Sequence, residues 1–182
     1  MPRSLLITFA LLLGSSALRA QDMPLSQILI DGEGWKSSGP PGVRSGYRPH
    51  PNTANRRGKL PTALAWSPDG GTLYAGYADS RAVWAFKFGK DEVPINGAPY
   101  CPLRLPGDAG EITVTAMTVD KDGRLYAATE IGIQVFDPTG RLCGVMESPT
   151  TPIEHLTFDG NLLCAWGVNT KYSRKLKTAG AN

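Results

Sequence analysis

The sequence predicts an all-β protein assembled from repeated units of short antiparallel strands, as in part of a β-propeller. From residue 60 onward, short apolar runs alternate with tight turns, and no window shows the apolar periodicity of an amphipathic helix. The same order of strand, Asp-Gly turn and strand occurs three times. These turns contain Asp69, Asp122 and Asp159, a spacing near the roughly 40 residues of a propeller blade. A β-sandwich is the alternative, but irregular insertions between like units suit a propeller better.

The first unit is "TALAWSPDGGTLYAGYADSRAVWAFKF", which predicts strands at residues 63–67, 72–77 and 82–88. The second is "VTAMTVDKDGRLYAATEIGIQVFDPTGRL", with a hairpin turn at Asp122-Gly123 and a further turn that begins at Asp137. The third is "IEHLTFDGNLLCAWGVNTKYSRKLKT". Asp-Gly between apolar runs favours a hairpin because glycine tolerates the positive φ of the turn. We therefore interpret Asp69, Asp122 and Asp137 as turn residues.

The chain of 182 residues predicts four segments. Residues 1–20 resemble a secretory signal peptide with cleavage near Ala20, because a basic start precedes a short apolar run and small residues; an uncleaved anchor is the alternative. Residues 21–35 form a lead-in motif, residues 36–59 a flexible basic linker, and residues 60–182 the partial propeller. The predicted location is secreted or periplasmic.

Charge is distributed unevenly along the chain. The net charge is +3, yet residues 36–59 hold six basic residues and no acidic one, and the body that follows is acidic. An acidic body excludes a nucleic-acid-binding surface. After the signal-like segment no apolar run has the length of a membrane span, so no membrane contact beyond that segment is expected. The basic segment, poor in aliphatic residues, is typical of a solvated linker.

Two motifs resemble those of the senescence marker protein, gluconolactonase and luciferin-regenerating enzyme family. "PTALAWSPDGGTLYAGYADSRAVWAFKF" is similar to the family's "PNGLAWSPDGKTLYVADS…VWAF", and "AMTVDKDGRLYAATEIGIQVFDPTGRLCGV" to its "DGMTVDAEGNLYVAT…GVQVFDP.GKLLGVI". The closing "KYSRKLKTAG" also resembles the family's C-terminal strand, and "LSQILIDGEGWK" resembles the lead-in to the first blade of bacterial secreted members. The likeness begins at residue 60 and extends to about residue 178. It implies a six-bladed propeller that hydrolyses sugar lactones or esters with an axial divalent metal, usually calcium.

The resemblance also implies which positions should hold the metal. The asparagine of "PNG" falls on Thr62, the aspartate of "DGM" falls on Thr115, and the "EGP" glutamate after the lead-in has no counterpart here. A hydroxyl is a weak calcium ligand, and loss of the carboxylates removes the negative charge that holds a dication. The sequence therefore predicts no catalytic, metal-binding or cofactor-binding residue, and calcium enters only by resemblance. A rearranged site that uses Glu111, Asp108 or Glu130 stays open.

Other chemistry-bearing residues have structural interpretations. Cys101, Cys143 and Cys164 have neither disulfide-scaffold nor zinc spacing, so we expect free thiols that pack as small apolar residues. His50 falls in the basic linker. His155, beside Glu154 at a strand start, is expected to be a structural histidine. No nucleophile elbow, phosphate loop or zinc-protease motif occurs in the sequence.

These observations predict a secreted gluconolactonase-like protein, truncated and with a degenerate metal site. Such a chain would be a non-catalytic binding or residual module, with a small sugar lactone as its candidate ligand. The alternative is an active lactonase or esterase with a rearranged site. Three blades cannot close a six-bladed ring, so three arrangements remain open: a homodimer that completes the propeller, an open fragment supported by another protein, or the product of a degraded gene.

Overall fold

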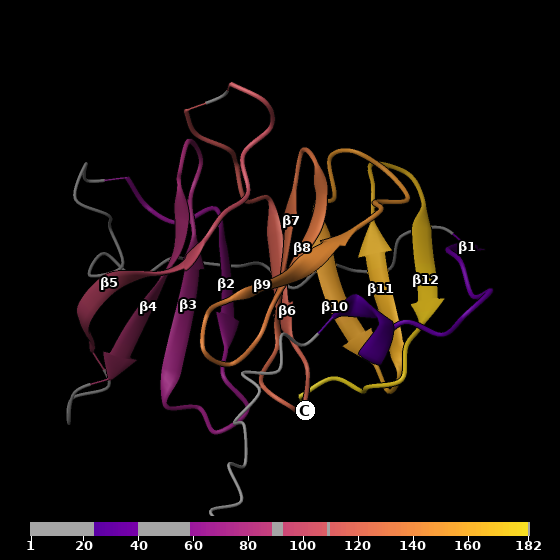
Figure 1. The fold of residues 1–182 in the computed structure, drawn as a ribbon, viewed down its shortest axis with the longest axis horizontal. Helices are drawn as coiled ribbons and strands as arrows, with labels where there is room; N and C mark the ends of the chain where they lie inside the picture. The colour runs from indigo at the N-terminus through magenta and orange to yellow at the C-terminus, as the bar shows by residue number, and fades with distance from the viewer. Residues whose placement is uncertain (1–23, 40–58, 89–92, 109, 182) are drawn as a thin grey trace, which may run out of the picture.

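The computed structural model describes residues 24–39, 59–88, 93–108 and 110–181. These residues form three four-stranded antiparallel sheets and one short 3-10 helix, η1 (Leu25–Gln27). Figure 1 shows the sheets side by side, with their inner strands next to one another in the middle of the molecule. This arrangement confirms the prediction of an all-β partial propeller, and each sheet is a blade.

The first blade contains β2 (Ala63–Trp66), β3 (Thr72–Gly76), β4 (Ala82–Phe88) and β5 (Pro94–Pro102), in that order from the inside outward. The predicted positions of β2, β3 and β4 are correct to within one residue. β5 is not apparent from the sequence, because its three prolines and one glycine weaken any strand pattern. An outermost strand tolerates prolines, since one of its edges needs no backbone donors.

The second blade contains β6 (Ala116–Val119), β7 (Leu125–Thr129), β8 (Gly132–Phe136) and β9 (Leu142–Met146). Every residue of β7 and β8 is buried. This continuous burial arises because a blade packs on each face of the sheet, so both alternating sets of side chains are covered.

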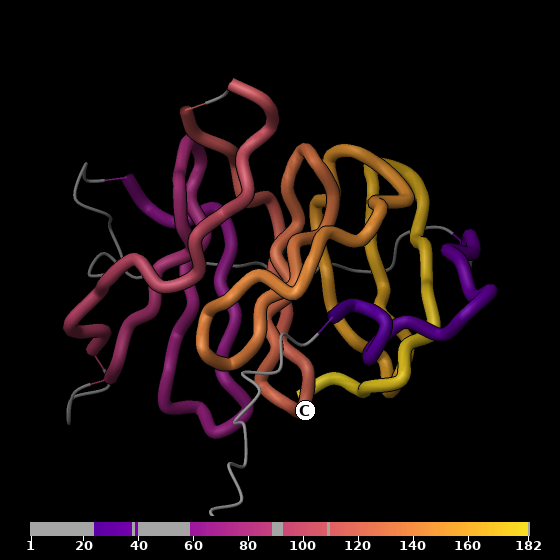
Figure 2. The backbone as a smooth tube through the Cα atoms, in the orientation of Figure 1, coloured from indigo at the N-terminus to yellow at the C-terminus, as the bar shows by residue number. Residues whose placement is uncertain are grey.

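The third blade contains β10 (His155–Asp159), β11 (Leu162–Trp166), β12 (Lys171–Lys175) and, outermost, β1 (Lys36–Gly39). β1 comes from the N-terminal part of the chain, and Figure 2 shows this segment beside the C-terminal strand. The basic linker predicted for residues 36–59 is therefore wrong for its first four residues. Residues 36–39 have no apolar side chain that would indicate a strand. Main-chain pairing with β12 alone defines β1.

The lead-in motif packs on the second and third blades. Ile28 is buried, and its neighbour Leu29 forms an isolated β-bridge with Leu176. The indole Nε1 of Trp35 donates a hydrogen bond of 2.8 Å to the carbonyl oxygen of Glu147. The third blade thus contains strands from both the C-terminal and the N-terminal part of the chain, and each part stabilises the other.

Two hydrophobic cores fill the spaces between the blades, and a third lies on the far face of the first blade. The core between the first two blades is built on Val83, Val114 and Phe136, and the core between the last two on Ile133 and Leu163. The third cluster contains Leu73, Ala75, Tyr77 and Phe86. This stacking leaves the second blade with a neighbour on each face.

Several predictions concern residues outside the described ranges. They are the signal peptide at residues 1–20, the linker beyond Gly39 up to residue 58, and His50. The three cysteines are free, with Cys101 and Cys164 buried and Cys143 half-buried. Burial raises the pKa of the Cys101 thiol to about 12, so it packs as a neutral side chain. Among the described residues, no helix has the length and hydrophobicity that a membrane span requires.

A buried carboxylate organises the hairpin of the second blade. Asp120 has no exposed surface, and its Oδ1 accepts hydrogen bonds from the backbone nitrogens of Asp122 and Arg124 at 3.0 and 2.9 Å. Its Oδ2 accepts from Arg124 Nη1 at 2.8 Å and from the Tyr126 hydroxyl at 3.0 Å. Burial alone would lower the pKa of Arg124, but the bonds to Asp120 and Asp122 outweigh it and raise the pKa.

We expect Asp120→Ala to lower the free energy of unfolding by about 3 kcal/mol, because the substitution leaves the buried Tyr126 hydroxyl without its acceptor and leaves the Arg124 guanidinium with Asp122 as its remaining carboxylate partner. Urea unfolding followed by circular dichroism measures the change. Asp69→Ala is the matched control: it removes the aspartate of the corresponding hairpin in the first blade, where the carboxylate is solvated. Equal losses for the two variants would contradict the role of Asp120.

Candidate axial site

The starts of the three inner strands meet at a small cavity. Its volume is about 130 Å³, and Thr62, Thr115, Glu154 and His155 line it together with the first residues of β2 and β6. Thr62 directly precedes β2, Thr115 precedes β6, and Glu154 precedes β10. The structure therefore brings together the two threonines that the family resemblance placed at metal-ligand positions, and it adds an acidic residue at the equivalent place in the third blade.

The Thr62 side chain links two blades. Its hydroxyl lies 2.5 Å from the carbonyl oxygen of Val114 and 3.2 Å from that of Gly76. Its backbone nitrogen also donates to the Gly76 carbonyl, at 2.8 Å. Val114 belongs to the segment that leads into β6, so the hydroxyl proton joins the start of the first blade to the start of the second.

Thr115 makes a weaker contact of the same kind. Its backbone nitrogen donates to the Ala128 carbonyl at 2.9 Å, and its hydroxyl lies 3.5 Å from the same oxygen, at the limit of a hydrogen bond. Thr115 and Ala128 both belong to the second blade. The hydroxyl thus stays within one blade, and it contributes less to the joint between blades than the hydroxyl of Thr62.

Glu154 and His155 are held by β11. The backbone nitrogen of Glu154 donates to the Trp166 carbonyl at 2.8 Å, and the His155 and Trp166 rings have centroids 5.0 Å apart with an interplanar angle of 59°. Lys171 places its ammonium 5.1 Å from the centre of the same indole ring. His155 therefore packs against Trp166, and it also lines the cavity.

Comparison with known proteins gives the family. A sequence match to the SMP-30/gluconolactonase/LRE-like region covers residues 47–164, which is more than half of the chain. The chain belongs to this family. A gluconolactonase from Zymomonas mobilis is 30% identical over 105 residues, and the match covers 54% of this chain and 29% of that protein.

Solved structures of the family resemble the chain in fold. A luciferin-regenerating enzyme superposes with a TM-score of 0.55 at 16% identity, and the match covers 70% of this chain and 52% of the enzyme. A gluconolactonase from Xanthomonas campestris superposes with a TM-score of 0.49 at 27% identity, over 64% of this chain and 37% of that one. The chain thus spans about half or less of each of these relatives.

The axial cavity does not fit the calcium ion that the family implies. Calcium takes six to eight oxygen ligands, among which carboxylates supply the charge. Among the residues that line the cavity, Glu154 is the single carboxylate, and the Thr62 hydroxyl is directed at backbone carbonyls. In the described part of the chain, no three His, Cys, Asp or Glu side chains cluster as a metal site would require.

The residues considered for a rearranged site lie elsewhere. Glu130, at the turn between β7 and β8, accepts hydrogen bonds from the backbone nitrogen of Thr113 at 3.2 Å to each carboxylate oxygen. Asp108 and Glu111 lie in the connection between β5 and β6, and neither contributes to the cavity lining. The structure therefore does not assemble these three acidic residues around the cavity.

Glu154 has no predicted role at the axis from the sequence. The available signal was positional: in each unit the residue before the inner strand faces the cavity, and Glu154 occupies that place in the third unit. Alignment of the three units on their inner strands would have placed it beside Thr62 and Thr115.

We expect Thr62→Val to lower the free energy of unfolding by about 1 kcal/mol, because it removes the hydroxyl that joins two blades and keeps the shape of the side chain. Thr115→Val is the control, since its hydroxyl makes only the longer contact within one blade. Urea unfolding of both variants measures the difference. A larger loss for Thr115→Val would contradict the bridging role of Thr62.

Proposed function

We propose that this protein is a non-catalytic member of its family that binds a small ligand instead of hydrolysing a lactone with a metal. The observation that carries the proposal is the axial cavity, where Thr62 and Thr115 occupy the positions at which the family resemblance implies stronger oxygen ligands, and where Thr62 forms a bridge between blades. One carboxylate cannot supply the charge that holds a dication in a partly dry site. The proposal includes export to the periplasm or the medium, on the strength of the signal-like N-terminal sequence.

We expect the purified protein to hydrolyse D-glucono-1,5-lactone no faster than buffer does, with calcium or with EDTA, because no described group holds a metal at the axis. Hydrolysis followed by pH indicator measures this, and calcium titration followed by thermal unfolding measures binding. Calcium should leave the melting temperature of the natural chain unchanged.

The matched control restores the family's side chains. The double variant Thr62→Asn and Thr115→Asp returns two oxygen ligands beside Glu154, and calcium should then raise its melting temperature by linkage. Calcium-dependent, EDTA-sensitive hydrolysis by the natural chain would overturn the proposal. A calcium-dependent rise in the melting temperature of the natural chain would overturn it as well.

A second candidate is a homodimer that completes the ring and gathers a rearranged site. The observation that favours it is that the first and third blades carry different side chains, which could contact each other between two copies. Trp66 is 49% exposed at the first blade and contacts Phe88 with ring centroids 4.7 Å apart, while the third blade presents the Lys171 and Trp166 pair. Two copies related by a two-fold axis would bring these ends together, with cation–π contact, and would add a second Glu154 to the axis.

If this homodimer forms, light scattering after size exclusion should give twice the mass of the chain, and Trp66→Ser should return it to a monomer. Ile95→Ser is the control, because Ile95 is an exposed apolar residue on the outermost strand of the same blade. A natural chain that stays monomeric at high concentration would rule out the homodimer and leave the first proposal unaffected.

A further inference from the structure

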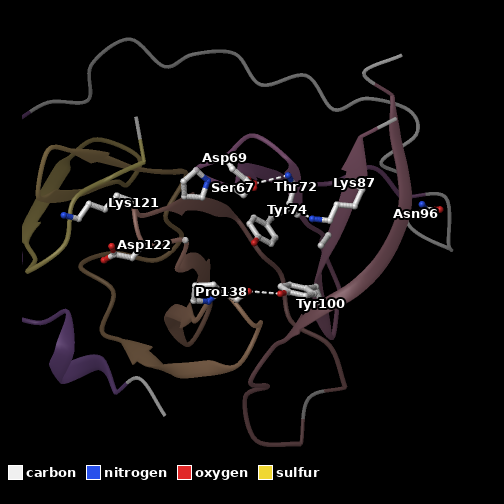
Figure 3. A pocket seen from close by; sticks show the side chains of 13 residues that line it. Ser67, Asp69, Thr72, Tyr74, Lys87, Asn96, Tyr100, Lys121, Asp122 and Pro138 are labelled. Carbon is white, nitrogen blue, oxygen red and sulfur yellow. Dashed lines mark hydrogen bonds between the residues drawn. The ribbon is translucent and has the colours of Figure 1, made fainter. Parts of the chain in front are cut away.

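A second and larger cavity lies between the first two blades, at their turn ends. It is a cleft of about 640 Å³, and its walls come from the β2–β3 turn, from β3, β4 and β5, from the β6–β7 turn and from Pro138 (Figure 3). Thr62 and Thr115 precede β2 and β6, whereas the residues that line this cleft follow them. The cleft is therefore separate from the axial cavity, and its volume lies in the range of small-molecule sites.

Two tyrosines form the aromatic wall of the cleft. The rings of Tyr74 and Tyr100 have centroids 6.1 Å apart and an interplanar angle of 32°. The Tyr100 hydroxyl donates a hydrogen bond of 2.7 Å to the Pro138 carbonyl, which ties β5 to the second blade and fixes the ring. Tyr100 remains 39% exposed, so part of its ring is open to a ligand.

The Tyr74 hydroxyl is a polar group that opens on the cleft. Within the described residues it makes no hydrogen bond, and Figure 3 shows it directed toward the space beside Tyr100 and Pro138. Burial raises the pKa of Tyr74 to about 12, so at neutral pH the hydroxyl carries its proton. The hydroxyl therefore offers a ligand in the cleft both a donor and an acceptor.

Charged groups of both signs surround the tyrosines and balance one another. Lys87 donates a hydrogen bond of 2.6 Å to the Thr72 hydroxyl, and its ammonium has two further protons. Asp69 accepts from the Ser67 hydroxyl at 2.5 Å and from the Gly71 nitrogen at 3.0 Å, both through Oδ1. Lys121 and Asp122 add one charge of each sign on the second blade.

We propose that this cleft binds a neutral saccharide, with a sugar ring against the tyrosine wall and its hydroxyls on the polar groups around it. The balanced charges favour a neutral ligand over an anion or a cation. The apolar faces of aromatic rings suit the C–H face of a sugar, and donors and acceptors lie together around them, as an array of hydroxyls requires. This inference rests on the proposed function, whose small ligand it names, but the site uses none of the residues at the axial cavity.

Saturation-transfer NMR and calorimetric titration with D-glucose and cellobiose test the site. We expect at least one of these sugars to bind, with glucose 6-phosphate and glucosamine binding more weakly than glucose. Tyr74→Phe should weaken binding by about 3- to 10-fold through loss of one hydrogen bond, with the ring retained. Tyr172→Phe, on β12, is the matched control and should leave the affinity unchanged.

Two more variants keep the test decisive. If Tyr74→Phe lowers the melting temperature, Lys87→Gln provides an exposed substitution in the same cleft that should also weaken binding. Glu154→Gln, at the axial cavity, should leave sugar affinity unchanged, so failure of this site and failure of the proposed function give different results. Absence of binding by both sugars, preference for the phosphate or the amine, or equal affinity in Tyr74→Phe and the natural chain would overturn the proposal.

Discussion

The Asp120 carboxylate joins several parts of this structure through its hydrogen bonds. Its four acceptor contacts fix the β6–β7 turn, the Arg124 guanidinium and the Tyr126 hydroxyl at once. Its backbone forms an isolated bridge with Gly180, and the next nitrogen, of Lys121, donates to the Ala179 carbonyl. The C-terminal segment, and with it the third blade, is therefore secured against the second blade at this turn. A buried carboxylate is tolerated here because every contact is a donor and one of them is a cation.

The same principle separates the two ends of the blades. At the turn ends, carboxylates such as Asp120 and Asp137 are satisfied by their own hairpins. Burial alone would raise the pKa of Asp137, but hydrogen bonds from Thr139 and Arg141 outweigh it and lower the pKa. At the starts of the strands, Thr62 and Thr115 contact backbone carbonyls. Charge thus stabilises the turn ends, neutral hydrogen bonds join the axial starts, and the tyrosine cleft lies at the charged end.

The sequence predicted those parts of the fold that local chemistry encodes. Asp-Gly turns and alternating apolar runs located β2, β3 and β4 to within a residue, and the family motifs placed Thr62 and Thr115 at what proved to be one cavity. β1 escaped prediction because only pairing with a distant strand defines it. The tyrosine cleft escaped as well, since it needs Tyr100 on a proline-rich strand to face Tyr74 across the blade. Both depend on long-range packing that no single window of sequence contains.

The threonines at the axis also bear on whether this fold needs a metal. The family resemblance implies carboxylates at this place, and like charges gathered without a cation repel one another and destabilise the folded state. Thr115 lies where that resemblance implies an aspartate, so a neutral hydroxyl replaces one of these charges, and Thr62, where an asparagine is implied, forms a hydrogen bond between blades. Glu154 then lies in the cavity without a second carboxylate among its lining residues. The three described blades can therefore hold their axial end together through neutral contacts, and a change that removes the metal site need not remove the fold.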